Sequence, residues 1–185
     1  MSINTLRSLI PAYGRDLALN LTNLLDETIL TDQQKWGTFV ACAHAIGVPE
    51  VLRHVEAAAI EVISPTAVTA AKSASAIMGM NNVYFRALHL LHNKEYEDMR
   101  SGLRMNILAN PGVDKIDFEL WAMAVSAVNA CGLCMDSHEQ ALREHGVSAL
   151  QVQATLRIAA TVNAISAVIR AEKAAQTELL SAVAS

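Results

Sequence analysis

Residues 121–134 read WAMAVSAVNACGLC, a stretch of mostly small and apolar residues that Gly132 interrupts near its end. Ala and Val with few breakers favour a helix, so the stretch predicts a helix that stops shortly before a second helix begins. Residues 36–49, WGTFVACAHAIGVP, match it when the chain is shifted by 85 residues, which aligns Trp36 with Trp121. The same pattern therefore occurs twice in the chain.

The similarity extends beyond these two stretches, because a one-residue adjustment aligns Ser64 with Ser148. We predict two degenerate helical repeats, roughly residues 33–92 and 118–176, within a single domain of residues 1–185. Each repeat would bury its apolar face against the other. Chance similarity between Ala-rich helices is the alternative explanation.

The composition favours an all-α fold. Hydrophobic residues make up 52% of the 185 residues and aromatic residues only 4%, with 8 Gly and 4 Pro, unlike a β-sandwich or barrel. Capping patterns such as Thr31 with Gln34, and Ser64 before Pro65, mark helix starts. The expected helices cover residues 4–26, 33–46, 50–62, 66–92, 95–106, 115–130, 132–145 and 149–180.

The charge balance argues against a nucleic-acid partner. The 14 Lys and Arg against 18 Asp and Glu give a net charge of -4, which leaves no surplus of cations for a phosphate backbone. Arg7, Pro11 and Arg15 interrupt the first twenty residues, unlike a secretory signal. Polar residues such as Arg157 and Asn163 interrupt the most apolar stretches, so we expect no membrane span and a cytoplasmic protein.

The cysteines carry the strongest functional signal. Cys131 and Cys134 form a CxxC pair, which in a reducing compartment indicates redox or metal chemistry, whereas Cys42 is expected to be a core residue. Because the first copy breaks at Gly47, a helix should begin near the CxxC pair. Cys134 would then lie in its first turn, where free N–H groups and the helix dipole stabilise a thiolate.

His138 follows Cys134 by four residues, so on a helix its imidazole lies beside that thiol and could act as a base or as a cation. We expect the Cys134 thiolate to attack a hydroperoxide and become a sulfenic acid while an alcohol leaves. Cys131, or a group behind it, would protonate the departing alkoxide, and Cys131 would then condense with the sulfenic acid to form a disulfide. An external dithiol would reduce the pair again.

Zinc binding is the alternative for the same residues. Cys131, Cys134, His138 and His145 could supply four ligands, although six residues between the histidines exceed the common spacing. The remaining histidines, several methionines and both tryptophans are expected to be packing or surface residues: His44, His54, His89, His92, Met78, Met80, Met135, Trp36 and Trp121.

Several motifs between Glu119 and His138 resemble the alkyl hydroperoxide reductase D (AhpD) family, within the carboxymuconolactone decarboxylase-like superfamily. They are ELWA from Glu119, AVS at 124–126, Asn129 and CGLC from Cys131. The resemblance spans the chain and implies an all-helical AhpD-like fold and a homotrimer. It implies that the protein reduces alkyl hydroperoxides weakly and, as its main task, returns electrons to a partner peroxiredoxin of the AhpC type. No bound cofactor is implied; the reductant would be dihydrolipoamide on a lipoylated acyltransferase, recharged by an NADH-dependent lipoamide dehydrogenase.

By position, Cys134 resembles the family's cysteine that forms the sulfenic acid and the mixed disulfide with the peroxiredoxin. Cys131 resembles its proton-donating and resolving partner, and Glu119 and His138 resemble its proton relay. The family's histidine in the second slot between the cysteines is Leu133 here. A relay through that histidine is therefore absent, which affects peroxide reduction more than thiol exchange.

Glu119 raises a question of distance. One straight helix would place it about 18 Å from Cys131, at about 1.5 Å per residue over twelve residues. The helix must therefore bend or fold back, or the glutamate must serve a neighbouring subunit, or its role is indirect. An N-terminal helix position after Asp114 and Asp117 is the purely structural explanation.

Two other functions stay open at this point. A decarboxylase or isomerase acting on a small lactone would share the fold class, but it needs no cysteine pair. A non-enzymatic helical protein that binds zinc through the CxxC motif is the second.

Overall fold

The computed structural model describes residues 3–96 and 98–183, and only the backbone of residues 177–183. The described residues form helices and contain no strand, which confirms the all-α prediction. The helices are α1 (Ile3–Ser8), α2 (Arg15–Asp26), α3 (Asp32–Ile46), α4 (Pro49–Ala59), α5 (Pro65–Leu90), α6 (Lys115–Val128), α7 (Gly132–Glu144) and α8 (Ala149–Val183). Three short 3-10 turns lie between them: η1 (Ala12–Gly14), η2 (Lys94–Tyr96) and η3 (Asn106–Leu108).

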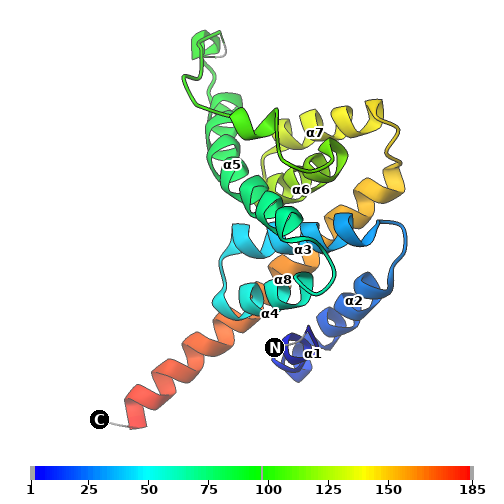
Figure 1. Cartoon of the computed structure of the whole chain (residues 1–185). Coiled ribbons are helices and arrows are strands. Elements are labelled where there is room, and N and C mark those ends of the chain that lie inside the picture. The colour runs from blue at the N-terminus through cyan, green and yellow to red at the C-terminus, as the bar shows by residue number, and fades with distance from the viewer. Residues whose placement is uncertain (1–2, 97, 184–185) are drawn as a thin grey trace.

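Helix α3 lies at the centre of the molecule and packs against α5, α6 and α8 (Figure 1). It begins at a capping box in which the Thr31 hydroxyl accepts from the Gln34 amide and the Gln34 side chain accepts from the Thr31 amide. The indole N–H of Trp121 on α6 donates to the Gln34 carbonyl oxygen at 3.1 Å. A Cβ at Gly37 would collide with the Trp121 ring, so glycine permits this close packing of α3 on α6.

Two expected helices differ from the structure. Residues 4–26 do not form one helix, because Pro11 lacks an N–H and has an extended ψ of 164°, so the chain is split into α1, η1 and α2. Within the helix expected at residues 95–106, the described residues 95–96 and 98–106 are largely non-helical: they are mostly exposed, and Gly102 has a positive φ of 66°. Without an apolar face to bury, that segment gains little from forming a helix.

Helices α3, α4 and α5 are followed by α6, α7 and α8, and in each set of three the last helix is the longest. The internal duplication of residues 33–92 and 118–176 stays a prediction.

Helix α8 differs from the expectation that no stretch of the chain is long and apolar enough to span a membrane. By length and composition Ala149–Gln176 could cross a membrane, because Arg157 and Asn163 do not lower its mean hydropathy enough. However, 56% of its most apolar window is buried inside the molecule, as in the core helix of a globular protein.

Four of the residues expected to be structural lie in the core: Trp36, Cys42, Met78 and Trp121. Cys42 is fully buried, and burial raises the pKa of its thiol to about 12, so it is an unreactive core residue as predicted. Trp36 and Trp121 are both buried, but Trp36 packs against Phe39 whereas Trp121 covers Gly37.

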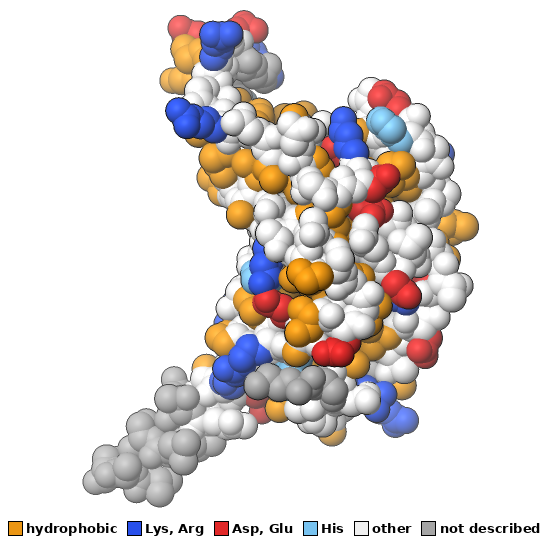
Figure 2. Space-filling view, viewed as in Figure 1, with side chains coloured by type: hydrophobic (Ala, Val, Ile, Leu, Met, Phe, Trp, Pro, Cys, Tyr) orange, Lys and Arg blue, Asp and Glu red, His pale blue; other side chains and the backbone are white. Residues whose placement is uncertain are grey.

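One face of α5 is left uncovered. Its exposed residues follow a helical spacing of three and four and are small or apolar: Ala76, Gly79, Val83, Ala87 and Leu90. Figure 2 shows hydrophobic side chains gathered over α5, at the upper left of the molecule. We refer to these five residues as the α5 stripe.

Candidate active site

The chain reverses direction between α6 and α7 in a tight turn. The Cys131 amide donates to the Ser126 carbonyl oxygen at 3.0 Å and the Ala130 amide to the Ala127 carbonyl oxygen at 3.1 Å. This is the hydrogen-bond pattern of a Schellman motif, which usually has glycine in the left-handed position. Here Ala130 occupies it with φ 53°, the one non-glycine positive φ among the described residues. Backbone strain is thus located directly before the first cysteine.

The two cysteines begin α7 and are joined by a disulfide, with Cα atoms 5.3 Å apart. Cys131 is the N-cap residue and is fully buried, whereas Cys134 lies in the first turn and keeps 7% of its surface exposed. The prediction of a helix that begins at the CxxC pair is therefore confirmed. Because the first-turn N–H groups and the helix dipole stabilise a negative charge, Cys134 is the cysteine suited to nucleophilic attack.

Glu119 and His138 meet because α7 folds back along α6. His138 Nδ1 lies 2.6 Å from Glu119 Oε2, and the two side chains are only 13% and 17% exposed. Within one chain α7 folds back on α6, so Glu119 reaches His138, and its link to the sulfur atoms is indirect. Glu119 contacts the histidine rather than a sulfur atom.

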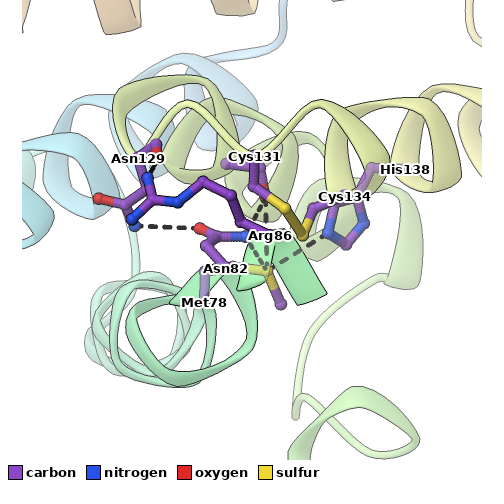
Figure 3. Close-up of a disulfide and its surroundings, with 8 residues drawn as sticks. Met78, Asn82, Arg86, Asn129, Cys131, Cys134 and His138 are labelled. Carbon is purple, nitrogen blue, oxygen red and sulfur yellow. Dashed lines mark hydrogen bonds between the residues drawn. A yellow bond between two sulfur atoms is a disulfide. The ribbon is translucent and has the colours of Figure 1, made fainter. Parts of the chain in front are cut away.

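The other ring nitrogen of His138 faces a methionine. His138 Nε2 lies 3.3 Å from the sulfur of Met78 on α5, a residue that is 1% exposed (Figure 3). A thioether and an ionised carboxylate only accept hydrogen bonds. The 2.6 Å contact between Nδ1 and Glu119 therefore holds one proton, and the Met78 sulfur can only accept a hydrogen bond from Nε2.

A hydrogen-bond network connects α5 to the turn before the cysteines. The Asn82 amide donates to Ser126 Oγ at 2.9 Å and lies 3.8 Å from the Met78 sulfur, and Asn129 Nδ2 donates to Asn82 Oδ1 at 3.0 Å. Arg86 donates to the Asn129 carbonyl oxygen (Figure 3). Two α5 side chains therefore hold the turn that carries the strained Ala130 and the first cysteine.

A cavity of about 360 Å³ opens beside the disulfide. Its wall combines the reactive group with a largely apolar lining: Met78, Asn81, Phe85, Met105, Leu108, Leu133, Cys134, Ser137 and His138. Leu133, which takes the slot of the family's histidine, is 45% exposed. Cys134 but not Cys131 lines the cavity, so a molecule bound there meets Cys134.

A larger hollow of about 580 Å³ lies along α5, beside the C-terminal ends of α3 and α6, and is lined by neither cysteine. We place the chemistry in the smaller cavity because it contains the redox sulfur and the imidazole.

The structure does not assemble the zinc site considered from the sequence. In the described part of the chain, no three His, Cys, Asp or Glu side chains form a group that could hold a metal ion. Both candidate thiolates are bonded to each other, and the His145 ring contacts the Ala141 carbonyl oxygen at 2.8 Å.

Sequence patterns do not reveal the contribution of α5 to the site. Met78 was interpreted as a core residue, which is correct for its burial but omits its contact with His138. Asn81, Asn82 and Arg86 were not singled out, because no local pattern relates them to cysteines about fifty residues later.

Comparison with known proteins places these features in context. The model of the carboxymuconolactone decarboxylase family matches residues 94–177. The chain is 62% identical to "Alkyl hydroperoxide reductase AhpD" of Maricaulis maris over 172 residues, which cover 93% of this chain and 99% of the relative. It is 54% identical to the protein of the same name from Hyphomonas neptunium over 178 residues, 96% of this chain and 99% of the relative. A Streptomyces avermitilis protein of that name is 51% identical over 172 residues, 93% of this chain and 97% of the relative.

Proposed function

The chain belongs to the AhpD family of alkyl hydroperoxide reductases, and from this premise we propose that it reduces alkyl hydroperoxides with the Cys131–Cys134 pair. The observation that carries the proposal is the disulfide between a buried cysteine and one that lines a cavity. A lactone decarboxylase would have no use for this bond.

In the proposed reaction the Cys134 thiolate attacks the terminal oxygen of the hydroperoxide. The S–O bond forms as the O–O bond breaks, so the sulfur is oxidised to a sulfenic acid and the electron pair leaves on the alkoxide. Cys131 then attacks the Cys134 sulfur, and the hydroxyl group leaves as water once protonated. The product is the disulfide present in the structure.

The departing alkoxide needs a proton, because an unprotonated alkoxide is a poor leaving group. The Glu119–His138 pair holds a proton between Nδ1 and Oε2, and His138 lines the same cavity as Cys134. We assign the pair to proton delivery, together with the Cys131 thiol, which is the sulfur closest to Cys134.

The reductant in this proposal is a dithiol from outside the protein, dihydrolipoamide on a lipoylated acyltransferase that a lipoamide dehydrogenase recharges. The apolar walls of the cavity suit the hydrocarbon part of a lipoyl arm as well as that of an alkyl hydroperoxide. Electrons then pass from Cys134 through a mixed disulfide to a peroxiredoxin of the AhpC type. With Leu133 in place of a histidine, thiol exchange is expected to be retained better than direct peroxide reduction.

We further propose a homotrimer, for which the α5 stripe supplies a contact surface. Val83 and Leu90 are 60% and 69% exposed, and the small residues of the stripe allow a second chain to approach closely (Figure 2). Val83→Glu should therefore dissociate the assembly, as measured by light scattering after size exclusion. The exposed Leu150→Glu on α8 is the matched control and should leave the mass unchanged.

Thiol titration tests the central proposal. After reduction, one equivalent of cumene hydroperoxide should remove two thiols from the wild type and from Cys42→Ser, the control with a buried unreactive cysteine. Cys131→Ser should stop at a sulfenic acid on Cys134, and Cys134→Ser should show no turnover with dihydrolipoamide. Normal turnover of Cys134→Ser would contradict the proposed function.

A further inference from the structure

A second asparagine on α5 faces the cavity rather than the turn. Met78, Asn81 and Phe85, spaced by three and four residues, lie on one side of α5 and line the cavity with Cys134. Asn82, the next residue, uses its amide in the network with Ser126 and Asn129. The two neighbouring asparagines therefore have different surroundings.

The amide oxygen of Asn81 is buried and accepts no hydrogen bond from any described residue, and the residue as a whole is 4% exposed. An unpaired buried acceptor costs about 1 to 3 kcal/mol. Two further buried side-chain atoms of the described residues lack a partner, on His54 and Ser166. Neither of those residues lines the cavity beside the disulfide, whereas Asn81 does.

We propose that Asn81 is a substrate-binding residue whose amide oxygen accepts a hydrogen bond from the O–H group of the hydroperoxide. This inference rests on the proposed function and names a residue that binds the reacting group. An acceptor needs a donor, and the terminal oxygen of a hydroperoxide carries the one O–H group of that molecule. The alkyl group then lies against Phe85, Met105 and Leu108.

The arrangement fits the chemistry of the attack. The oxygen held by Asn81 is the oxygen that the Cys134 thiolate attacks, and it keeps its hydrogen as part of the sulfenic acid. The O–O bond breaks on the far side, and the alkoxide takes its proton from the Glu119–His138 pair. Asn81 therefore orients the terminal oxygen without taking part in proton transfer.

The test measures the two half-reactions separately in Asn81→Leu, which is close in size but has no amide. Oxidation of the reduced protein by cumene hydroperoxide should slow by about threefold to tenfold, the effect of one lost hydrogen bond. Reduction of its disulfide by dithiothreitol should stay within about twofold of wild type. The same loss is expected with tert-butyl hydroperoxide, because both substrates carry the same O–O–H group.

Thermal unfolding distinguishes a substrate-binding role of Asn81 from a structural role. Removal of an unpaired buried acceptor leaves the melting temperature unchanged or raises it, so the variant should be slower but no less stable. Asn163→Leu, at an exposed position of α8, is the matched control and should change neither half-reaction. Asn81→Ala provides a second variant with the same expected kinetic loss if the leucine does not fold.

Three results would overturn the inference: unchanged oxidation in the folded variants, equal slowing of both half-reactions, or a large loss of stability. If the proposed function itself is wrong, the result differs: the reduced wild-type protein would then react with neither hydroperoxide.

Discussion

Glu119→Gln tests the proton relay most directly. The substitution keeps the size of the side chain and an oxygen that can accept from His138 Nδ1, but it removes the charge and the second proton site. A hydrogen bond to a charged group contributes about 1.5–3 kcal/mol, against about 1 kcal/mol for a neutral one. Because the two side chains are only 13% and 17% exposed, solvent screens the contact little, and the 2.6 Å separation fits a charge-assisted bond.

The difference of about 1 kcal/mol corresponds to a loss of about fivefold in the rate of alkoxide protonation, since 1.4 kcal/mol is a factor of ten. The assay is the steady-state reduction of cumene hydroperoxide with dihydrolipoamide, measured at saturating reductant so that the peroxide half-reaction limits the rate. Disulfide exchange with dithiothreitol should change little, because thiol exchange needs no alkoxide leaving group.

Glu139→Gln is the matched control. It makes the same chemical change on α7, in a half-exposed pair in which Glu139 lies 3.8 Å from Arg143. Such exposed pairs contribute little, so the control should reduce peroxide at the wild-type rate. A wild-type rate for Glu119→Gln, or an equal loss in both variants, would refute the assignment of the relay.

Three further predictions concern the support of the site. Ala130→Gly should raise the free energy of unfolding in urea by up to about 1 kcal/mol, because glycine adopts the φ of 53° without strain although it also increases the entropy of the unfolded chain. Gly37→Ala should lower the free energy of unfolding by about 2–3 kcal/mol, and the melting temperature with it, because its Cβ would collide with the Trp121 ring. The hydrogen bond from Lys72, and a smaller one from His44, hold the pKa of Glu56 below its ordinary value of 4.5, so this carboxylate stabilises the fold above that pH and loses its contribution on acidification. Glu56→Gln should therefore be about 0.5–1 kcal/mol less stable than wild type at pH 7, and the difference should shrink as the pH falls through the lowered pKa; a difference that does not depend on pH would contradict this explanation.

Most helices and the position of the reactive cysteines could be predicted because both depend on local signals. The capping box at Thr31 and the proline after Ser64 coincide with the starts of α3 and α5. The start of α7 at Gly132 was expected from the break at Gly47 in the matching stretch. The turn itself lies two residues earlier than that match implies, because Ala130 takes the left-handed conformation that a glycine adopts at position 47. An alanine gives no sequence signal for such a turn.

The contribution of α5 could not be predicted, because it depends on which side of the helix faces the disulfide. Asn82 is 44 residues from Ser126 and 47 from Asn129, and no spacing rule relates residues so far apart. Likewise, Glu119 was assigned through resemblance, and only the fold-back of α7 on α6 brings it to His138. The packing of α5 and α7 against α6, which no residue pattern predicts, therefore brings the remaining residues to the site.

Helix α5 contacts the surroundings of both cysteines. Asn82 and Arg86 hold the turn that fixes Cys131, while Met78 and Asn81 face the cavity in which Cys134 would meet its substrate. A small rotation of α5 would therefore shift the Met78 contact with the relay, the substrate contact and the support of the disulfide together. The α5 stripe lies on the same helix, so packing of a second chain against it would restrict that rotation. If this coupling holds, Val83→Glu should slow hydroperoxide oxidation as well as dissociate the assembly, although Val83 lines no wall of the reaction cavity. A dissociated variant that oxidises at the wild-type rate would show that the site of one chain is complete without its neighbours.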